Sequence, residues 1–244
     1  MNKTVQELID RKSVRVFLNK KISKKNKELI LKSAVNGPSA GNQQMYRIID
    51  ITDQKIKDKL AVLCDNQSFI AKADLVLVFC GDFRKWYDSF DNVGLKPRKV
   101  QVGDLILAIE DSLIAAENAV TAAWSLGIGS CYIGDILENK EKVKELLDLP
   151  DYVFPSTLVV FGYPTKQQLE RVKPKREDLK HLVCENKYKK YSKKDLEKMF
   201  MTKHNFKTVD DYQNWLKRFY QRKYNSNFSK EMSRSVKEYL KEYK

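Results

Sequence analysis

Apolar residues gather in short continuous runs along this chain, and segments with helical spacing separate the runs. Residues 75–79 and 156–161 are such runs, and their length and composition predict strands that are buried on both faces. Residues 45–52 and 131–133 are predicted as two further strands. Because helical segments lie between the strands, we expect an α+β or α/β architecture.

The longest apolar segment, residues 105–126, carries hydrophobic side chains around most of a helix. It is long enough to cross a bilayer, but Glu110, Asp111 and Glu117 would each be costly there. We therefore predict a buried central helix that ends at Gly127, with a sheet on one side and a partner subunit on the other.

Shorter helices are predicted from the positions of polar capping residues. The spacing from Thr4 to Glu7 is that of a capping box, which predicts a helix over residues 4–9. Ser23 is placed to cap a second helix that stops near Gly37. Two more helices are expected around residues 56–63 and 139–147.

Composition narrows the class of protein. With 244 residues, 42% of them hydrophobic, the chain can build a large core. The N-terminus has no apolar segment typical of a secretory signal, and the four cysteines are widely spaced, so we expect a cytoplasmic protein without disulfides. Neither the cysteines nor the two histidines have the spacing of a metal site, and none is predicted.

Charge divides the chain into two parts. Residues 1–165 hold 23 Lys and Arg against 21 Asp and Glu, whereas residues 166–244 hold 23 against 11, which leaves +12 of the total +14 in the second part. We predict one core domain over residues 1–165 and a basic C-terminal extension over 166–244 that packs on the core. A basic tail is also typical of nucleic-acid binding, but its cations alternate with aromatic residues at helical spacing, which favours amphipathic helices.

Two short basic motifs suggest an anion site. Arg11, Ser13 and Arg15 alternate, so that in an extended backbone their side chains share one side. Two guanidinium groups beside a hydroxyl suit a phosphate, because arginine pairs with phosphate oxygens through two parallel hydrogen bonds. Lys173 and Lys175 flank a proline that holds them extended, and they are predicted to close the same site.

The segments between these motifs contain polar groups suited to a flat ligand. Residues 38–44 form a loop with small residues, the hydroxyl of Ser39 and the amide of Asn42, while Gln67 stands before a buried strand. The glycine-rich segment 127–134 lacks the order of a dinucleotide fingerprint, because it follows a helix and its third glycine comes too late.

The order of these motifs resembles the nitroreductase family of FMN-dependent oxidoreductases, over residues 5 to about 176 with interruptions. Within it, the size of the chain and its helical extension resemble the NADPH-dependent, oxygen-insensitive nitroreductases and flavin reductases. The resemblance implies an α+β fold with a central mixed or antiparallel sheet flanked by helices. It also implies a homodimer whose FMN lies at the subunit interface, and a C-terminal extension that packs on the partner subunit. From the charge patterns above we expect neither a membrane nor a nucleic acid as a partner.

The resemblance assigns roles to positions in this sequence. The cradle for the FMN phosphate and ribityl chain would consist of Arg11, Ser13, Arg15, Lys173 and Lys175. Polar contacts to the ring or ribityl chain would come from Ser39, Asn42 and Gln67, and the wall behind the ring from Tyr132, Ile133 and Gly134. Arg218, Arg222 and Lys223 are candidates for contacting the 2′-phosphate of NADPH.

Three positions depart from the pattern of the family. Asp135 stands where the branch tends to have a small residue, Tyr46 where many relatives carry tryptophan, and Lys175 where arginine is more common. Asp135 and Lys175 put the exact flavin contacts in doubt.

The resemblance implies that the flavin performs the chemistry, so that no catalytic side chain is needed. NADPH, or NADH, would reduce FMN, and a nitroaromatic, quinone or flavin would then be reduced in a ping-pong cycle. Arg15 or Lys173 would also stabilise the reduced, anionic flavin. Three alternatives stay open: a flavoenzyme of the same fold with other chemistry such as dehalogenation, a basic nucleic-acid-binding protein, and a thiol redox protein.

Overall fold

The computed structural model describes all 244 residues, which divide into two compact units. The first contains Met1–Arg171 together with Glu231–Lys244, and the second contains Val172–Lys230. The predicted boundary near residue 165 stays a prediction, but the last fourteen residues pack with the first unit rather than with the rest of the extension.

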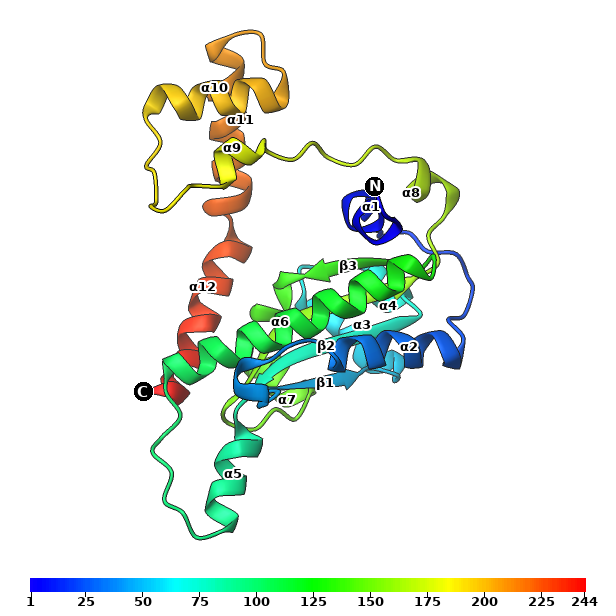
Figure 1. Cartoon of the computed structure of the whole chain (residues 1–244), viewed down its shortest axis with the longest axis vertical. Helices are drawn as coiled ribbons and strands as arrows, with labels where there is room; N and C mark the ends of the chain where they lie inside the picture. The colour runs from blue at the N-terminus through cyan, green and yellow to red at the C-terminus, as the bar shows by residue number, and fades with distance from the viewer. The chain divides into compact units, whose positions relative to one another are not determined.

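A four-stranded sheet forms the centre of the first unit (Figure 1). All its strands pair in antiparallel fashion in the order β1-β2-β4-β3, which confirms the predicted α+β class. The strands are β1 (Tyr46–Asp50), β2 (Leu75–Asp82), β3 (Gly129–Ile133) and β4 (Val153–Gly162). Every residue of β2 is buried, as its continuous apolar run predicts.

Helices cover both faces of the sheet. Alternate residues of β2 serve the two sides, with Val76 and Val78 in one hydrophobic cluster and Leu77 and Phe79 in the other. The helices of this unit are α1 (Lys3–Asp10), α2 (Lys24–Val35), α3 (Gln54–Leu63), α4 (Phe69–Lys72), α5 (Arg84–Asn92), α6 (Val102–Ser125), α7 (Lys140–Leu146), α8 (Lys166–Glu170) and the later part of α12 (Asn227–Leu240).

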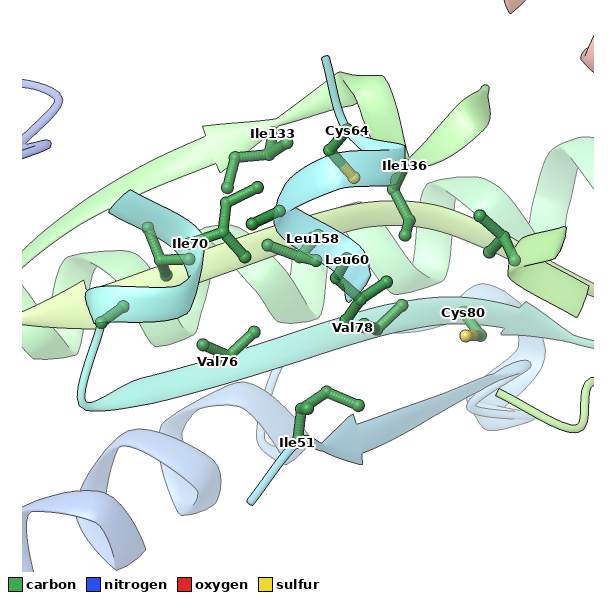
Figure 2. Close-up of a cluster of buried hydrophobic side chains, with 14 of the residues drawn as sticks. Ile51, Leu60, Cys64, Ile70, Val76, Val78, Cys80, Ile133, Ile136 and Leu158 are labelled. Atoms are coloured by element: carbon green, nitrogen blue, oxygen red, sulfur yellow. The ribbon is translucent and has the colours of Figure 1, made fainter. Parts of the chain in front are cut away.

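The two clusters differ in the helices that build them. Helices α3, α4 and α7 pack on one face, where Leu60, Ile70 and Ile133 meet over the sheet (Figure 2). Helices α2 and α6 pack on the other face, and α6 contributes mainly small side chains there, among them Ala116 and Ala119. None of the helices is both long enough and apolar enough to cross a membrane.

Local signals explain where several helices begin and end. The hydroxyl of Ser23 accepts a hydrogen bond from Asn26 N and caps α2, as predicted. The prediction that Thr4 begins the first helix is wrong. Asn2 is the N-cap of this helix, and the side chain of Asn2 accepts a hydrogen bond from Val5 N at 3.0 Å. Helix α6 ends at Ser125 with Leu126 as its C-cap, and Gly127 follows with a φ of +71° that suits glycine, as predicted for the end of this helix.

The C-terminal end of the chain packs against the first unit. Tyr239 and Tyr243 are fully buried in a third cluster, where Tyr239 meets Phe154 edge to face with ring centroids 5.0 Å apart.

The second unit has its own small aromatic core, in which the ring centroids of His204 and Trp215 are 4.3 Å apart. Its helices are α9 (Leu179–Leu182), α10 (Lys193–His204) and α11 (Val209–Phe219), followed by a π-helical turn (Tyr220–Tyr224).

The extended segment that contains Ser13 and Val14 precedes α2, and it crosses the free edge of strand β3 in close contact with it. Ser13 forms an isolated parallel bridge with Ser130, and Val14 N donates to Ser130 O at 2.8 Å. A Cβ on Gly129 would lie 2.6 Å from Cγ2 of Val14, whose side chain has no exposed surface. Glycine is therefore required at this crossing.

We expect Gly129→Ala to lower the free energy of unfolding by about 1–3 kcal/mol, because the stiff, buried Val14 cannot yield to the new methyl group. Chemical denaturation measures the change. Gly103→Ala is the control, since no heavy atom lies within 4 Å of its Cβ position. Equal stability of the two variants would show that the crossing is not tightly packed.

Candidate functional site

The crossing at β3 brings together three of the predicted phosphate-binding residues. Arg11 ends α1, and the extended segment after it carries Ser13 and Arg15 alongside Ser130. The Nη1 atom of Arg11 is buried and has no hydrogen-bond partner, so its charge is available for an anion. Burial raises the pKa of the neighbouring Cys131 thiol, while Arg15, Ser13 and Arg11 oppose that rise.

A third cation, Arg171, joins this group from the end of the first unit. Arg171 Nη2 donates to the carbonyl oxygen of Ser13 at 2.7 Å, and Lys12 Nζ donates to the carbonyl oxygens of Leu169 and Arg171 at 2.5 and 2.6 Å. These bonds tie residues 169–171 to the segment Arg11–Arg15, the basic pentad. Arg171 was not among the predicted site residues, although it lies two residues before Lys173 and shares its alternation with Lys175.

Lys173 and Lys175 themselves belong to the second unit. Their predicted place in the phosphate cradle therefore stays a prediction.

Gln67 lies beside the turn that follows β3. Its Nε2 donates to Asp135 Oδ2 at 2.8 Å and to the carbonyl oxygen of Cys64 at 3.0 Å. This hydrogen bond between residues 68 positions apart joins Gln67 to Asp135, which follows Gly134, the last residue of the predicted wall. The structure brings these two predicted parts of the site together.

The carboxyl group of Glu138 is buried near the pair of Gln67 and Asp135. Glu138 is only 5% exposed, and its Oε1 atom has no hydrogen-bond partner. Burial is the largest cause that raises the pKa of Glu138 to about 7, and the nearby carboxylates of Asp135, Asp65 and Glu231 add to it. At neutral pH this group is poised between its neutral and its charged form.

The predicted wall residues divide between the two faces of the sheet. Tyr132 is half-buried, and its hydroxyl donates to Glu117 Oε2 of α6 at 3.0 Å. Burial, followed by the charge of Glu117, raises the pKa of Tyr132, which therefore stays protonated. Ile133 is buried as a whole residue, at 1% exposure, and its side chain packs in the core. Gly134 is exposed.

The polar loop of residues 38–44 is anchored by a carboxylate that the sequence did not single out. Asp111 of α6 is 2% exposed, and it accepts hydrogen bonds from Ala40 N at 2.9 Å and from Met45 N at 3.0 Å. Ser39 Oγ accepts from Gln44 N at 3.0 Å, and Asn42 is exposed in the left-handed region at φ 55°. A charged residue inside the apolar pattern of α6 was the signal for this role.

Within one chain, this loop and the basic pentad lie at opposite edges of the sheet. The loop leads into β1, while the pentad crosses β3, and these are the two edge strands. Three interstrand spacings of about 4.8 Å separate β1 from β3, or about 14 Å. Ser39 and Asn42 are therefore not brought to Arg11, Ser13 and Arg15 by the fold of a single subunit.

The residues around β3 fit the chemistry of FMN. An unpartnered buried guanidinium nitrogen lies among cations and a hydroxyl at the start of the strand, as a phosphate requires. An amide and an exposed glycine lie at its other end, where a polar ring can be bound.

Comparison with known proteins finds similar sequences and structures. The sequence pattern described as "Nitroreductase family" matches residues 8–163. The chain is 32% identical to the oxygen-insensitive NADPH nitroreductase of Salmonella typhimurium, with 80% of this chain and 78% of the relative covered. It is 28% identical to an FMN reductase [NAD(P)H] of Bacillus subtilis, with 74% of each covered. The crystal structure of nitroreductase A from Vibrio parahaemolyticus superposes with a TM-score of 0.77 at 30% identity, over 84% of each chain.

The raised pKa of Glu138 predicts a pH-dependent stability. A carboxyl that holds its proton more tightly in the folded chain costs stability once the pH passes its unfolded pKa of about 4.3, and the cost is complete above pH 7. We expect Glu138→Gln to raise the melting temperature by about 2–4 °C at pH 8, and the gain to shrink as the pH falls to about 4. Thermal melts across this range measure it.

Glu145→Gln, on the exposed side of α7, is the control for the loss of one carboxylate. A gain for Glu138→Gln that is the same at every pH would contradict the assignment.

Proposed function

This chain belongs to the nitroreductase family, and we propose that it is an FMN-dependent enzyme that is reduced by NADPH and passes the electrons to nitroaromatics, quinones or flavins. The observation that carries the proposal is the buried, unpartnered Nη1 atom of Arg11 beside Ser13 and Arg15 at the start of β3. When bound, FMN supplies the hydride chemistry. The residues of the chain bind it, orient it and tune its charge.

The phosphate-binding end of the site is cationic. Arg11 and Arg15 supply guanidinium groups, Ser13 a hydroxyl, and Arg171 holds the backbone of Ser13 in place. Lys173 and Lys175 are proposed to complete this end. A cation near the ring, from Arg15 or Lys173, stabilises a reduced and negatively charged flavin, because Coulomb attraction is strong in a partly desolvated site.

A homodimer completes the site. Helix α6 turns its small side chains toward its own sheet and leaves large ones exposed: Ile106 is 50% and Leu107 43% exposed, with Leu113 and Ile114 on the same helix. Such an apolar face suits a second copy of the chain. In that dimer the 38–44 loop of one subunit, with Ser39 and Asn42, faces the cradle of the other.

The preference for NADPH over NADH is proposed from the second unit. This unit carries 17 Lys and Arg against 7 Asp and Glu, a net +10. Arg218 and Arg222 line a surface cavity of about 770 Å³ with Trp215 and Phe219, where an adenine ring and a 2′-phosphate find both aromatic and cationic groups. Lys223 instead lies 5.2 Å from the centre of the Phe228 ring.

A thiol redox function is less well supported. Burial raises the pKa of Cys64 and Cys131, and raises that of Cys80 to about 12, so these thiols stay protonated and unreactive at neutral pH. A relative of the same fold with different chemistry is distinguished by whether NADPH reduces its flavin.

The first test is an absorbance spectrum of the purified protein, with and without NADPH in the absence of oxygen. We expect bands near ~450 and ~370 nm that bleach with NADPH, and more slowly with NADH. Arg15→Ala is expected to lose most of the flavin on gel filtration, because one cation of the phosphate cradle is removed. Arg98→Ala, an exposed arginine paired with Asp104, is the control.

Full flavin content and normal turnover in Arg15→Ala would contradict the cradle. A colourless wild-type protein that also fails to bind added FMN would overturn the proposed function itself.

Hybrid dimers test whether two subunits share each site. One subunit carries Arg11→Ala and Arg15→Ala, and the other carries Ser39→Ala and Asn42→Ala, with different affinity tags. If each site uses the cradle of one subunit and the loop of the other, the hybrid has one intact site and one doubly altered site. We then expect about half of the wild-type FMN content, against little in either parent dimer. A hybrid that binds no more FMN than the parents would place both parts of the site within one subunit.

A further inference from the structure

The side-chain amide of Gln67 has both of its N–H groups committed within the protein. They donate to Asp135 Oδ2 at 2.8 Å and to the carbonyl oxygen of Cys64 at 3.0 Å. A backbone carbonyl and a carboxylate can only accept, so a flipped amide would set oxygen against oxygen. The nitrogen of Gln67 must therefore face these two groups, and its Oε1 atom must face away from them.

The position of Asp135 is fixed by the structure around it. It lies in the 3₁₀ turn Gly134–Leu137 that follows β3, and its carbonyl oxygen accepts from Glu138 N at 3.0 Å. Ile136, the next residue of the turn, is completely buried in the core. The carboxylate is thus presented to Gln67 from a rigid backbone.

The charge near Asp135 also favours this arrangement. Glu138 is buried next to it, and its pKa is raised to about 7 by burial and by the carboxylates of Asp135, Asp65 and Glu231. A neutral Glu138 leaves the negative charge on Asp135, where Gln67 donates to it.

We propose that Asp135 is a positioning residue, which holds the Gln67 amide so that Gln67 presents only its carbonyl oxygen to the flavin ring. Gln67 then accepts a hydrogen bond from a ring N–H group, and N3–H is the group of that kind in oxidised FMN. This inference rests on the proposed function, since it requires FMN at the site.

The test compares two substitutions of Asp135 with different hydrogen-bonding capacity. Asp135→Asn keeps an oxygen that accepts from Gln67 and removes the charge, whereas Asp135→Ala removes the acceptor. The dissociation constant of FMN, measured by quenching of its fluorescence, is expected to rise ~5–10-fold in Asp135→Ala and to stay within about twofold of wild type in Asp135→Asn. Equal weakening in both variants would assign the effect to charge and overturn the proposal.

N3-methyl-FMN supplies a second readout, because methylation removes the ring N–H group. In the wild type we expect it to bind ~10-fold more weakly than FMN, and in Asp135→Ala we expect no difference between the two ligands. A penalty of the same size in both proteins would show that Asp135 does not act through this hydrogen bond.

Gln67→Leu keeps the test decisive if Asp135→Ala unfolds early. It should show the same loss of affinity for FMN and the same indifference to methylation. Adding Asp135→Asn to it should change nothing further, because Asp135 acts through Gln67. If the wild type binds no FMN, the proposed function fails; if it binds FMN and these variants bind it equally well, only the role of Asp135 fails.

Discussion

The close approach of α6 to the sheet is the constraint on which the rest of the first unit depends. A Cβ on Gly81 of β2 would lie 3.0 Å from the backbone carbon of Ala108, so helix and strand meet almost backbone to backbone. Only small residues fit this contact, and four larger apolar residues of α6 are exposed on its outer side: Ile106, Leu107, Leu113 and Ile114. The packing of the core thus creates the apolar face to which we assign the partner subunit.

Asp111, a buried carboxylate on the same helix, links the packing of the core to the shape of the candidate site. Asp111 lies on the sheet-facing side of α6, where an unpaired carboxylate would cost several kcal/mol. The backbone N–H groups of Ala40 and Met45 pair with it, and this pairing shapes the loop that carries Ser39 and Asn42. Folding of the core and shaping of the loop are therefore one event, because Asp111 is stable inside only when the loop is in place.

The sequence predicts best what depends on local patterns. Apolar runs located β2 and β4, Ser23 and Gly127 located helix ends, and the alternation of Arg11, Ser13 and Arg15 indicated an extended cationic segment. The contacts of Gln67 with Asp135 and of Asp111 with the 38–44 loop join residues 68 and 71 positions apart, and no local pattern records such a pairing. The sequence predicted an extension that packs on the core, but it did not identify Tyr239 and Tyr243 as residues that do so, since amphipathic spacing shows which face is apolar but not what it packs against.

Strand β3 organises the electrostatics of the site. Arg11, Arg15 and Arg171 gather at its first residues, whereas Asp135 and Glu138 follow its last. Five residues of strand separate the two groups, about 14 Å of backbone rise. A ligand with an anionic end and an uncharged polar end is held best when it lies along this gradient, with its phosphate at the cations. If the ligand lay in the reverse orientation, its phosphate would be beside two carboxyl groups. The gradient therefore fixes the orientation of the ligand and brings its ring to Gln67.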